Sequence, residues 1–131
     1  MIYTSDDGSF GLHGLVTQPL ETMLKQANTH GPGIGEVIAI GPPLMMRAVS
    51  ELTRPYGVKT IASLNSVMID ATGMCGACMV PIHKEDQLLR KHACVDGPEF
   101  DAHSIDWEKL LPRFKQFNLQ ELRSQELKGL S

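Results

Sequence analysis

The amino-acid sequence predicts an α/β fold, in which a partial parallel-sheet domain is followed by a small β-hairpin domain and a helical tail. Two observations support this prediction. Over the first 64 residues, short apolar runs alternate with stretches of helical periodicity, which is the pattern of βαβ units. Beyond residue 64 the sequence becomes loop-like, and all three cysteines follow. We therefore expect three parts, at residues 1–64, 65–105 and 106–131.

The first part is expected to contain three strands and two helices. In chain order these are a strand at 1–4, a helix at 15–27, a strand at 36–40, a helix at 44–54 and a strand at 58–64. The middle strand reads Glu-Val-Ile-Ala-Ile and is nearly all apolar, as in strands that are buried on both faces of a parallel sheet. Two such βαβ steps correspond to half of a nucleotide-binding domain.

The second part predicts a hairpin between two loops. Residues 79–83 and 88–93 are expected to pair as antiparallel strands around a turn at 84–87. Loops are expected on either side, at 65–77 and 94–100.

The tail is charged and intermittently amphipathic. Its pattern predicts two short helices that are split at Pro112, because proline removes a helical hydrogen bond. Trp107 is expected to be a packing anchor.

The composition argues against several classes of function. The net charge of −3 gives no electrostatic attraction to nucleic acid or to an anionic membrane surface. A run of about 18 apolar residues, which a membrane-spanning helix needs, is absent from the sequence. The first residues have neither the basic nor the apolar segment of a secretory signal. Three cysteines are too few and odd in number for a disulfide framework, which favours reduced thiols in the cytoplasm.

The cysteine spacing predicts a metal site. Asp70, Cys75, Cys78 and Cys94 are separated by four, two and fifteen residues. Plant-type binuclear iron–sulfur clusters are held by C-x4-C-x2-C and a distant cysteine, so an aspartate here takes the place of the first cysteine. A carboxylate oxygen is a harder ligand than a thiolate, yet it can bind ferric iron.

Glycines in this segment support the same site. Gly73 and Gly76 allow the backbone to wrap closely and to aim amide groups at the sulfur atoms.

Other interpretations of these residues remain open. The Cys75-x2-Cys78 pair is equally compatible with structural zinc, in which case His83, His92 or His103 replaces Asp70 as the fourth ligand. The three thiols are also compatible with a buried apolar role, and Asp70 with a role in capping its loop.

Two segments are candidates for nucleotide binding. Asp6, Asp7, Gly8 and Ser9 follow a predicted strand, where an acidic side chain accepts hydrogen bonds from ribose hydroxyls and repels a 2′-phosphate, which favours NAD(H). Asp-Gly is also a common turn sequence.

The second candidate segment begins with Gly41 and Pro42, at the C-terminal end of a predicted strand, where open α/β sheets bind ligands. The alternative is a helix start, with Met45 and Met46 packing in the core.

Four stretches together resemble one family. They are residues Thr4–Gly11, Ile40–Met46, Gly73–Cys78 and Cys94–Asp101. Through them the chain is similar to the C-terminal portion of the alpha subunit of bifurcating NADH-dependent ferredoxin:NADP oxidoreductases, also called sulfide dehydrogenase subunits. A more distant similarity is to the electron-transfer subunit of dihydroorotate dehydrogenase. The resemblance covers about residues 1–105.

The resemblance implies a ferredoxin–NADP reductase-like fold and an electron-transfer function. In that family a flavin-binding β-barrel is followed by a nicotinamide-nucleotide domain and a small cluster domain. The full subunit is expected to use NAD(H) or NADP(H), FAD and a [2Fe-2S] cluster. In the bifurcating branch an aspartate replaces one cluster cysteine, as Asp70 does here, which favours that branch over the dihydroorotate branch.

The resemblance also implies which parts of the full subunit lie outside this sequence. The barrel and the first half of the nucleotide domain have no counterpart here, so FAD is expected on the remainder of the full-length subunit. This fragment alone is expected to be inactive. The expected partner is a second oxidoreductase subunit similar to the small subunit of glutamate synthase, and an exposed sheet edge predicts self-association of the fragment.

Overall fold

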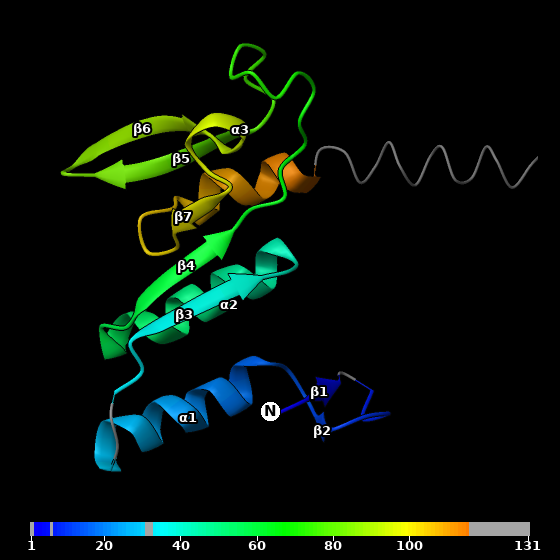
Figure 1. The fold of residues 1–131 in the computed structure, drawn as a ribbon, viewed down its shortest axis with the longest axis vertical. Helices are drawn as coiled ribbons and strands as arrows, with labels where there is room; N and C mark the ends of the chain where they lie inside the picture. The colour runs from blue at the N-terminus through cyan, green and yellow to red at the C-terminus, as the bar shows by residue number, and fades with distance from the viewer. Residues whose placement is uncertain (1, 6, 31–32, 116–131) are drawn as a thin grey trace, which may run out of the picture.

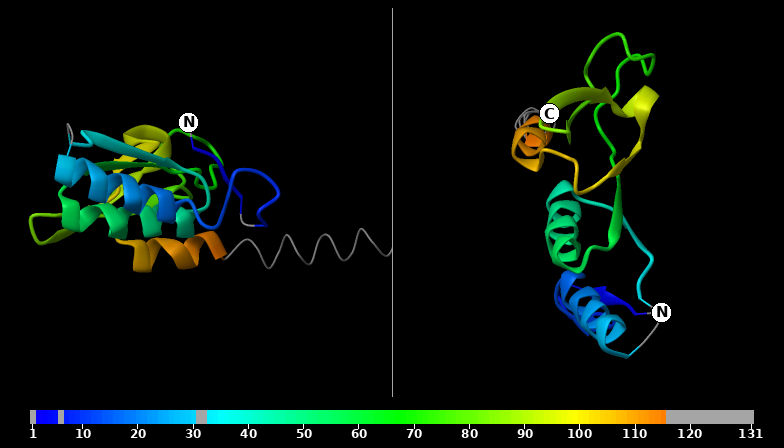
Figure 2. Two further views of the ribbon diagram at one scale, coloured as in Figure 1. Left: turned by 90° about the horizontal axis from the view of Figure 1, so that it is seen from below. Right: turned by 90° about the vertical axis from the view of Figure 1, so that its left-hand side faces the viewer.

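The computed structural model describes residues 2–5, 7–30 and 33–115, whose elements lie at three levels along the long axis (Figure 1). One end is formed by β1 (Thr4–Ser5), β2 (Leu12–His13) and α1 (Thr17–His30), and the middle by β3 (Glu36–Ile40), α2 (Pro43–Thr53) and β4 (Lys59–Ser63). The other end is formed by the hairpin of β5 (Met79–Lys84) and β6 (Gln87–His92). The helices stack on one side of the molecule and the strands lie beside them (Figure 2). Within these described ranges the architecture is mixed α/β, with three small sheets.

The first level differs from the sequence prediction. β1 (Thr4–Ser5) and β2 (Leu12–His13) form a two-residue parallel pair, which is followed by α1 (Thr17–His30). The prediction that the first strand spans residues 1–4 and joins the other parallel strands is therefore wrong for the described residues. The physical reason is local, because the amide of Leu12 donates to the carbonyl of Tyr3 at 2.9 Å and the loop folds back on its own start.

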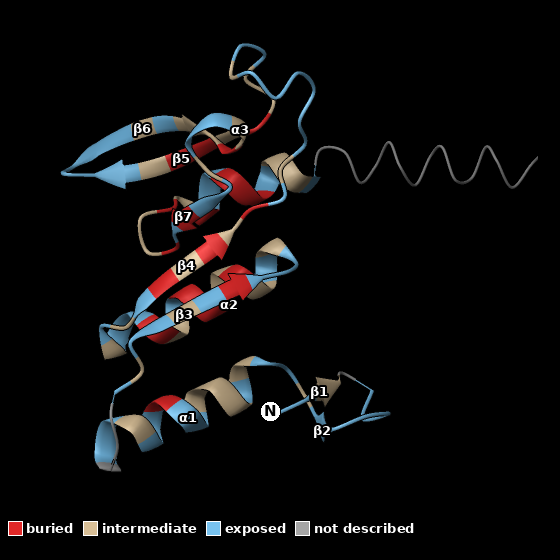
Figure 3. Ribbon diagram, in the orientation of Figure 1, coloured by how far each residue is buried: buried red, intermediate tan, exposed pale blue. Residues whose placement is uncertain are grey.

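The middle level confirms one predicted βαβ unit. β3 (Glu36–Ile40) and β4 (Lys59–Ser63) pair in parallel through α2 (Pro43–Thr53) and the short 3-10 helix η1 (Arg54–Tyr56). Val37 and Ala39 face the helix side, and Ala39 is buried. Ile38 and Ile40 are 60% and 71% exposed, so one face of this strand has no cover among the described residues (Figure 3).

The third level contains the predicted hairpin. β5 (Met79–Lys84) and β6 (Gln87–His92) are antiparallel, and their register pairs Met79 with His92 at the open end. Glu85 and Asp86 form a two-residue turn with positive φ at both positions, which matches the right-handed twist of the strands.

The segment after the hairpin is more regular than predicted. The loop expected at residues 94–100 is instead a short helix, α3 (Ala93–Asp96), and a strand, β7 (Glu99–Asp101), which pairs antiparallel with β4. Only Phe100 of that strand faces the core, and three residues are too few for a periodic signal in the sequence. Residues 107–115 are helical through Pro112, so the split predicted there is not found. Apolar packing of Leu110 and Leu111 holds this helix in spite of the missing proline N–H.

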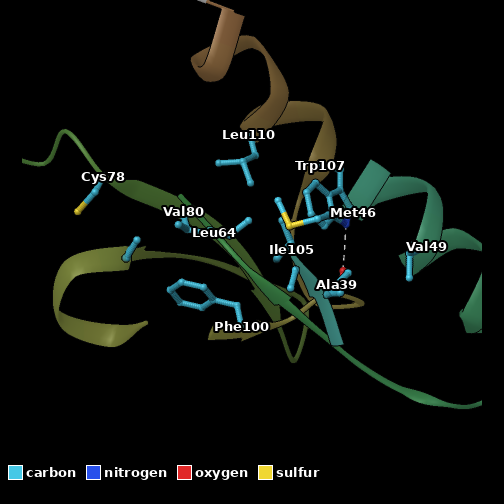
Figure 4. Packing of buried hydrophobic residues seen from close by; sticks show 13 residues of the cluster. Ala39, Met46, Val49, Leu64, Cys78, Val80, Phe100, Ile105, Trp107 and Leu110 are labelled. Carbon is cyan, nitrogen blue, oxygen red and sulfur yellow. Dashed lines mark hydrogen bonds between the residues drawn. The ribbon is translucent and has the colours of Figure 1, made fainter. Parts of the chain in front are cut away.

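One apolar core joins the middle and third levels (Figure 4). Trp107 is 6% exposed and is the packing anchor that the sequence predicts. Its Nε1 donates to the carbonyl of Ala102 at 3.0 Å, and the same carbonyl accepts a hydrogen bond from Ser50 Oγ at 2.9 Å. This core contains residues from all three predicted parts, among them Leu64, Val80 and Leu110. The core therefore gives no boundary at residues 64 and 105, and the division there stays a prediction. No helix within the described ranges is long and apolar enough to cross a bilayer.

Candidate metal centre

The loop at residues 65–78 connects β4 to β5 and carries three of the four predicted metal ligands (Figure 1). It turns through left-handed backbone at Ala71, Gly73 and Gly76. Gly73 has a φ of 84°, and a Cβ atom at this position would lie 2.8 Å from Cγ2 of Val95. A glycine is therefore required for the loop to pass this close to α3, which carries the fourth predicted ligand.

The hairpin brings two of the cysteines together. Cys78 directly precedes β5, and Cys94 lies in α3 directly after β6. Because the two strands are antiparallel, both residues lie at the open end of the hairpin, where the amide of Ala93 donates to the carbonyl of Cys78 at 3.0 Å. The two Sγ atoms are 3.2 Å apart as free thiols, and Cys78 is 2% exposed.

The two thiols of this pair differ in acidity. Burial acts to raise the pKa of Cys78, but hydrogen bonds from the amide and thiol of Cys94 outweigh it, so the pKa lies below its usual range. The pKa of Cys94 is raised by its hydrogen bond to Cys78 and by burial, although the amide of Gly73 acts in the opposite direction. Cys78 is therefore the more readily ionised member of the pair, and a thiolate is the form that binds metal.

Asp70 and Cys75 are the other two predicted ligands, and both lie in the loop at residues 65–78. The carboxylate of Asp70 accepts a hydrogen bond from the amide of Thr72 at 2.9 Å. This amide, and to a lesser extent the thiol and amide of Cys75, hold the pKa of Asp70 below its usual range. Cys75 is exposed and Asp70 lies at the surface, so this half of the site faces solvent.

The positions of the four predicted ligands bear on the kind of metal group that they could hold. Within the described ranges, no three potential ligands converge on one point at the spacing that a single ion needs. Two thiolates on one tetrahedral metal with bonds of about 2.3 Å lie roughly 3.8 Å apart. The Cys78–Cys94 separation of 3.2 Å is close to this value. Three thiols and a carboxylate in one region, with two of the thiols this close, have the donor chemistry that a binuclear group needs.

The histidines considered for a zinc site are engaged elsewhere in two cases. Nε2 of His83 lies 3.1 Å from Oδ2 of Asp106, and Nε2 of His103 lies 3.0 Å from Oγ1 of Thr53. His92 pairs with Met79 in the hairpin, and its amide donates to Asp96. None of these contacts directs an imidazole to the cysteine loop.

The described residues of the first predicted nucleotide segment lie at the other end of the molecule, between β1 and β2. The amide and hydroxyl of Ser9 donate to Asp7 at 3.0 and 2.7 Å, and they hold the pKa of Asp7 below its usual range. Gly8 has a φ of 72° within this turn, and Asp6 lies outside the described residues.

The second nucleotide segment lies at the C-terminal end of β3. Pro42 caps α2, and its carbonyl accepts a hydrogen bond from the amide of Met46, which is itself buried. Gly41 has a φ of 153° and lies against the side chain of Met45. Thr4 and Ile40 line one open apolar cavity of about 300 Å³, so the strands that precede both segments border the same space.

Sequence reasoning missed one charged residue near the cysteines. Nη2 of Arg113 donates to the carbonyl oxygens of Gly76 and Ala77 at 3.4 and 3.3 Å. These are the two residues between Cys75 and Cys78. No sequence signal indicates this contact, because Arg113 is more than thirty residues further along the chain, in a segment that reads as a solvated helix.

Comparison with known proteins connects this site to a family. The family model for the iron–sulfur cluster binding domain of dihydroorotate dehydrogenase B matches residues 65–106. A Thermotoga maritima protein named as a homologue of the dihydroorotate dehydrogenase B (NAD(+)) electron transfer subunit is 38% identical over 126 residues, which are 96% of this chain and 42% of that protein. A Methanocaldococcus jannaschii protein, named as a probable subunit of the same kind, is 30% identical over 112 residues, which are 86% of this chain and 39% of that protein.

A solved structure is also similar over nearly the whole chain. It is the NADH-dependent reduced ferredoxin-NADP oxidoreductase, which was determined to give insight into flavin-based electron bifurcation. The TM-score is 0.72 at 39% sequence identity, and the match covers 99% of this chain and 43% of the other. The chain thus spans about two-fifths of the length of the relatives that it matches.

Proposed function

Residues 65–106 belong to the family of iron–sulfur cluster binding domains of dihydroorotate dehydrogenase B, and from this premise we propose that the chain is the electron-relay module of a flavin-dependent oxidoreductase. The observation that carries the proposal is that the matched segment contains all four predicted ligands, two of which, Cys78 and Cys94, lie with their sulfur atoms 3.2 Å apart. An iron–sulfur family supports this function over the alternative of a zinc-stabilised interaction domain without a redox role.

The proposed group is a [2Fe-2S] cluster, held by Asp70, Cys75, Cys78 and Cys94. The number of predicted ligands supports a cluster of two irons, because each iron needs two ligands from the protein. We assign Asp70 and Cys75 to one iron, and Cys78 and Cys94 to the other. When bound, such a cluster accepts and releases single electrons.

The ligands of the two irons would differ in their exposure to solvent. The Cys78–Cys94 pair lies on the hairpin and is partly buried, so it provides a rigid and less hydrated half. The Asp70–Cys75 pair lies on an exposed loop, so it provides the half that a redox partner can approach. The oxygen ligand is harder than a thiolate and favours the ferric state of its iron.

The rest of the relay is proposed from the relatives and the resemblance. NAD(H) or NADP(H) would lie at the segment containing Asp6, Asp7, Gly8 and Ser9 and at the turn of Gly41 and Pro42. The strands that precede these two segments line one cavity through Thr4 and Ile40, which supports this placement. FAD would be bound by the part of the longer protein that this sequence does not include. The relatives named as electron transfer subunits support a partner subunit, for which we propose an oxidoreductase similar to the small subunit of glutamate synthase. We propose a cytoplasmic location, because the three cysteines are free thiols and thiols stay reduced in the cytoplasm.

The test is the metal and sulfide content of protein purified without oxygen. The expected result is about two irons and two acid-labile sulfides per chain, with an EPR signal that appears on reduction. Asp70→Ala is expected to lower iron retention, whereas the control Asp86→Ala, at the far tip of the hairpin, is expected to leave it unchanged. One zinc per chain with no iron or sulfide, under the same handling, would refute the proposal.

A further inference from the structure

One guanidinium group braces the loop between two of the cysteines. Arg113 is half-buried in the helix at residues 107–115, and its Nη2 atom donates to the carbonyl oxygens of Gly76 and Ala77 at 3.4 and 3.3 Å. A terminal amino group of arginine has two hydrogens, so both contacts can form at once. The brace therefore holds the only two residues that separate Cys75 from Cys78.

The helix that carries this arginine is firmly held by the core. Trp107 is 6% exposed, Leu110 is 1% exposed and Leu111 is 8% exposed. A cavity of about 100 Å³ separates this helix from the loop, and Ser66, Ala77 and Arg113 are among its lining residues. The guanidinium thus extends from a rigid element past a small cavity to a loop without regular secondary structure. This arrangement lets the core control the conformation of the loop.

The contacts fix the direction of two amide groups. The carbonyl of Gly76 shares a planar peptide unit with the amide of Ala77, and the carbonyl of Ala77 shares one with the amide of Cys78. In a trans peptide the C=O and N–H bonds point in opposite directions. When Arg113 holds both carbonyls, the amides of Ala77 and Cys78 point away from the helix. Amide donors around cluster sulfurs are one of the main determinants of reduction potential.

The charge of the arginine acts in the same direction. A guanidinium stays protonated at all ordinary pH values, and none of the ion pairs found among the described residues involves Arg113. Reduction adds one negative charge to an iron–sulfur site, so a nearby positive charge stabilises the reduced form. This charge effect favours reduction, and it adds to any hydrogen bond that the Ala77 and Cys78 amides donate to a cluster sulfur.

We infer that Arg113 is a positioning residue that raises the reduction potential of the iron–sulfur site by holding the Cys75–Cys78 loop from behind. This inference rests on the proposed function, because a potential exists only if the site holds an iron–sulfur group. The bracing of the loop itself does not depend on the metal.

The first measurement is a redox titration of anaerobically purified protein, followed by EPR. Arg113→Met is expected to make the midpoint potential more negative, with at least a tenfold change in the reduction equilibrium, which is 59 mV for one electron. Arg113→Lys keeps the charge and is expected to recover most of the shift. The control Lys115→Met removes one charge from an exposed position two residues further along the same helix, and is expected to leave the potential unchanged.

An unchanged potential in Arg113→Met, at full iron content, would overturn the inference, and so would an equal shift in Lys115→Met. If Arg113→Met retains no metal, Arg113→Gln takes its place in the same titration with the same expected direction. Hydrogen exchange of metal-free protein is the independent readout, in which the Ala77 and Cys78 amides are expected to exchange faster in Arg113→Met. If the natural protein shows no iron–sulfur signal, the proposed function fails, whereas unchanged exchange at these two amides shows that the brace is absent.

Discussion

The core around Trp107 and the cysteine loop at residues 65–78 are neighbours that are held in different ways. Leu64, the last core residue before the loop, is 2% exposed, whereas Ile69 and Met74 within the loop are 76% and 88% exposed. The core is stabilised by apolar area removed from water, and its polar groups are hydrogen-bonded. The loop has left-handed turns, three of the four predicted ligands and the hydrogen bonds from Arg113.

The comparison shows that fold and metal site have separate physical origins in this chain. Core residues stabilise the fold by packing against one another, so a substitution that removes apolar contacts at one of them lowers the free energy of unfolding of the whole protein. The predicted ligands in the loop act through the oxygen and sulfur atoms that bind metal. A substitution of these atoms is therefore expected to alter metal binding more than folding. Four substitutions test this separation, and they are ordered from the largest expected effect to the smallest.

Cys78→Ser is expected to abolish iron and sulfide binding while the fold persists, because serine is close in size to the cysteine that it replaces in the core cluster. Cys78 is the buried member of the thiol pair, and a serine hydroxyl is a poor ligand for iron at neutral pH. Metal analysis and far-ultraviolet circular dichroism of the metal-free protein provide the two readouts. If the metal-free variant unfolds, loop and core are not separable and the comparison fails.

Trp107→Ala is expected to destabilise the metal-free protein by about 3–5 kcal/mol, because it opens a cavity in the core and removes a hydrogen bond to Ala102. Denaturant unfolding measures this loss. Ile69→Ala, at an exposed apolar position in the loop, is the matched control and is expected to change stability little. Equal losses in both variants would contradict the distinction between the two regions.

Ser50→Ala is expected to cost about 1 kcal/mol in the same unfolding experiment. The substitution removes the hydrogen bond from Ser50 Oγ to the carbonyl of Ala102, yet that carbonyl keeps its bond from Trp107. The loss is therefore smaller than that of Trp107→Ala. Ser66→Ala, whose hydroxyl has no hydrogen-bond partner within the described residues, is the matched control and should cost less. A loss for Ser66→Ala at least as large as for Ser50→Ala would refute this ordering.

Asp106→Asn is expected to change the acid dependence of stability and little else. Burial acts to raise the pKa of Asp106, but hydrogen bonds from Lys109 and His83 outweigh it, so the pKa is lowered from about 3.8. A lowered pKa stabilises the folded state above pH 4, and this contribution is lost as the pH falls through the folded value. Asparagine keeps the cap of the helix at 107–115, since the side chain still accepts from the Lys109 amide. Thermal unfolding from pH 7 to pH 3 should show a shallower fall in the variant, and identical curves would refute the role of this carboxylate.

The sequence predicted those features that depend on local pattern. The strand at residues 36–40 has the predicted bounds, because four apolar residues in a row indicate a strand. The prediction that it is buried on both faces is wrong for the described residues, since Ile38 and Ile40 are exposed. The hairpin was predicted within one residue at each end, because its two strands flank an obvious turn. The spacing of the cysteines identified the loop, although the roles of its four predicted ligands stay a prediction. These features need no knowledge of distant contacts.

The features that the sequence did not reveal depend on contacts between distant segments. β7 is a strand only because it lies beside β4, about forty residues earlier in the chain. The helix continues through Pro112 because Leu110 and Leu111 are buried against other elements. The contact of Arg113 with Gly76 and Ala77 arises from the same docking. Propensity and spacing contain no record of such packing.

The hairpin geometry has a practical consequence for attaching this protein to other objects. The turn at Glu85 and Asp86 is exposed and lies at the opposite end of β5 from Cys78. Six residue steps of about 3.4 Å, from Met79 to Glu85, place it roughly 20 Å from the start of the strand. A dye, an affinity handle or an electrode linker inserted at this tip would leave the strand register at Met79 and His92 intact. The turn at Glu85 and Asp86 is therefore the position that we expect to tolerate a label or an electrode linker best.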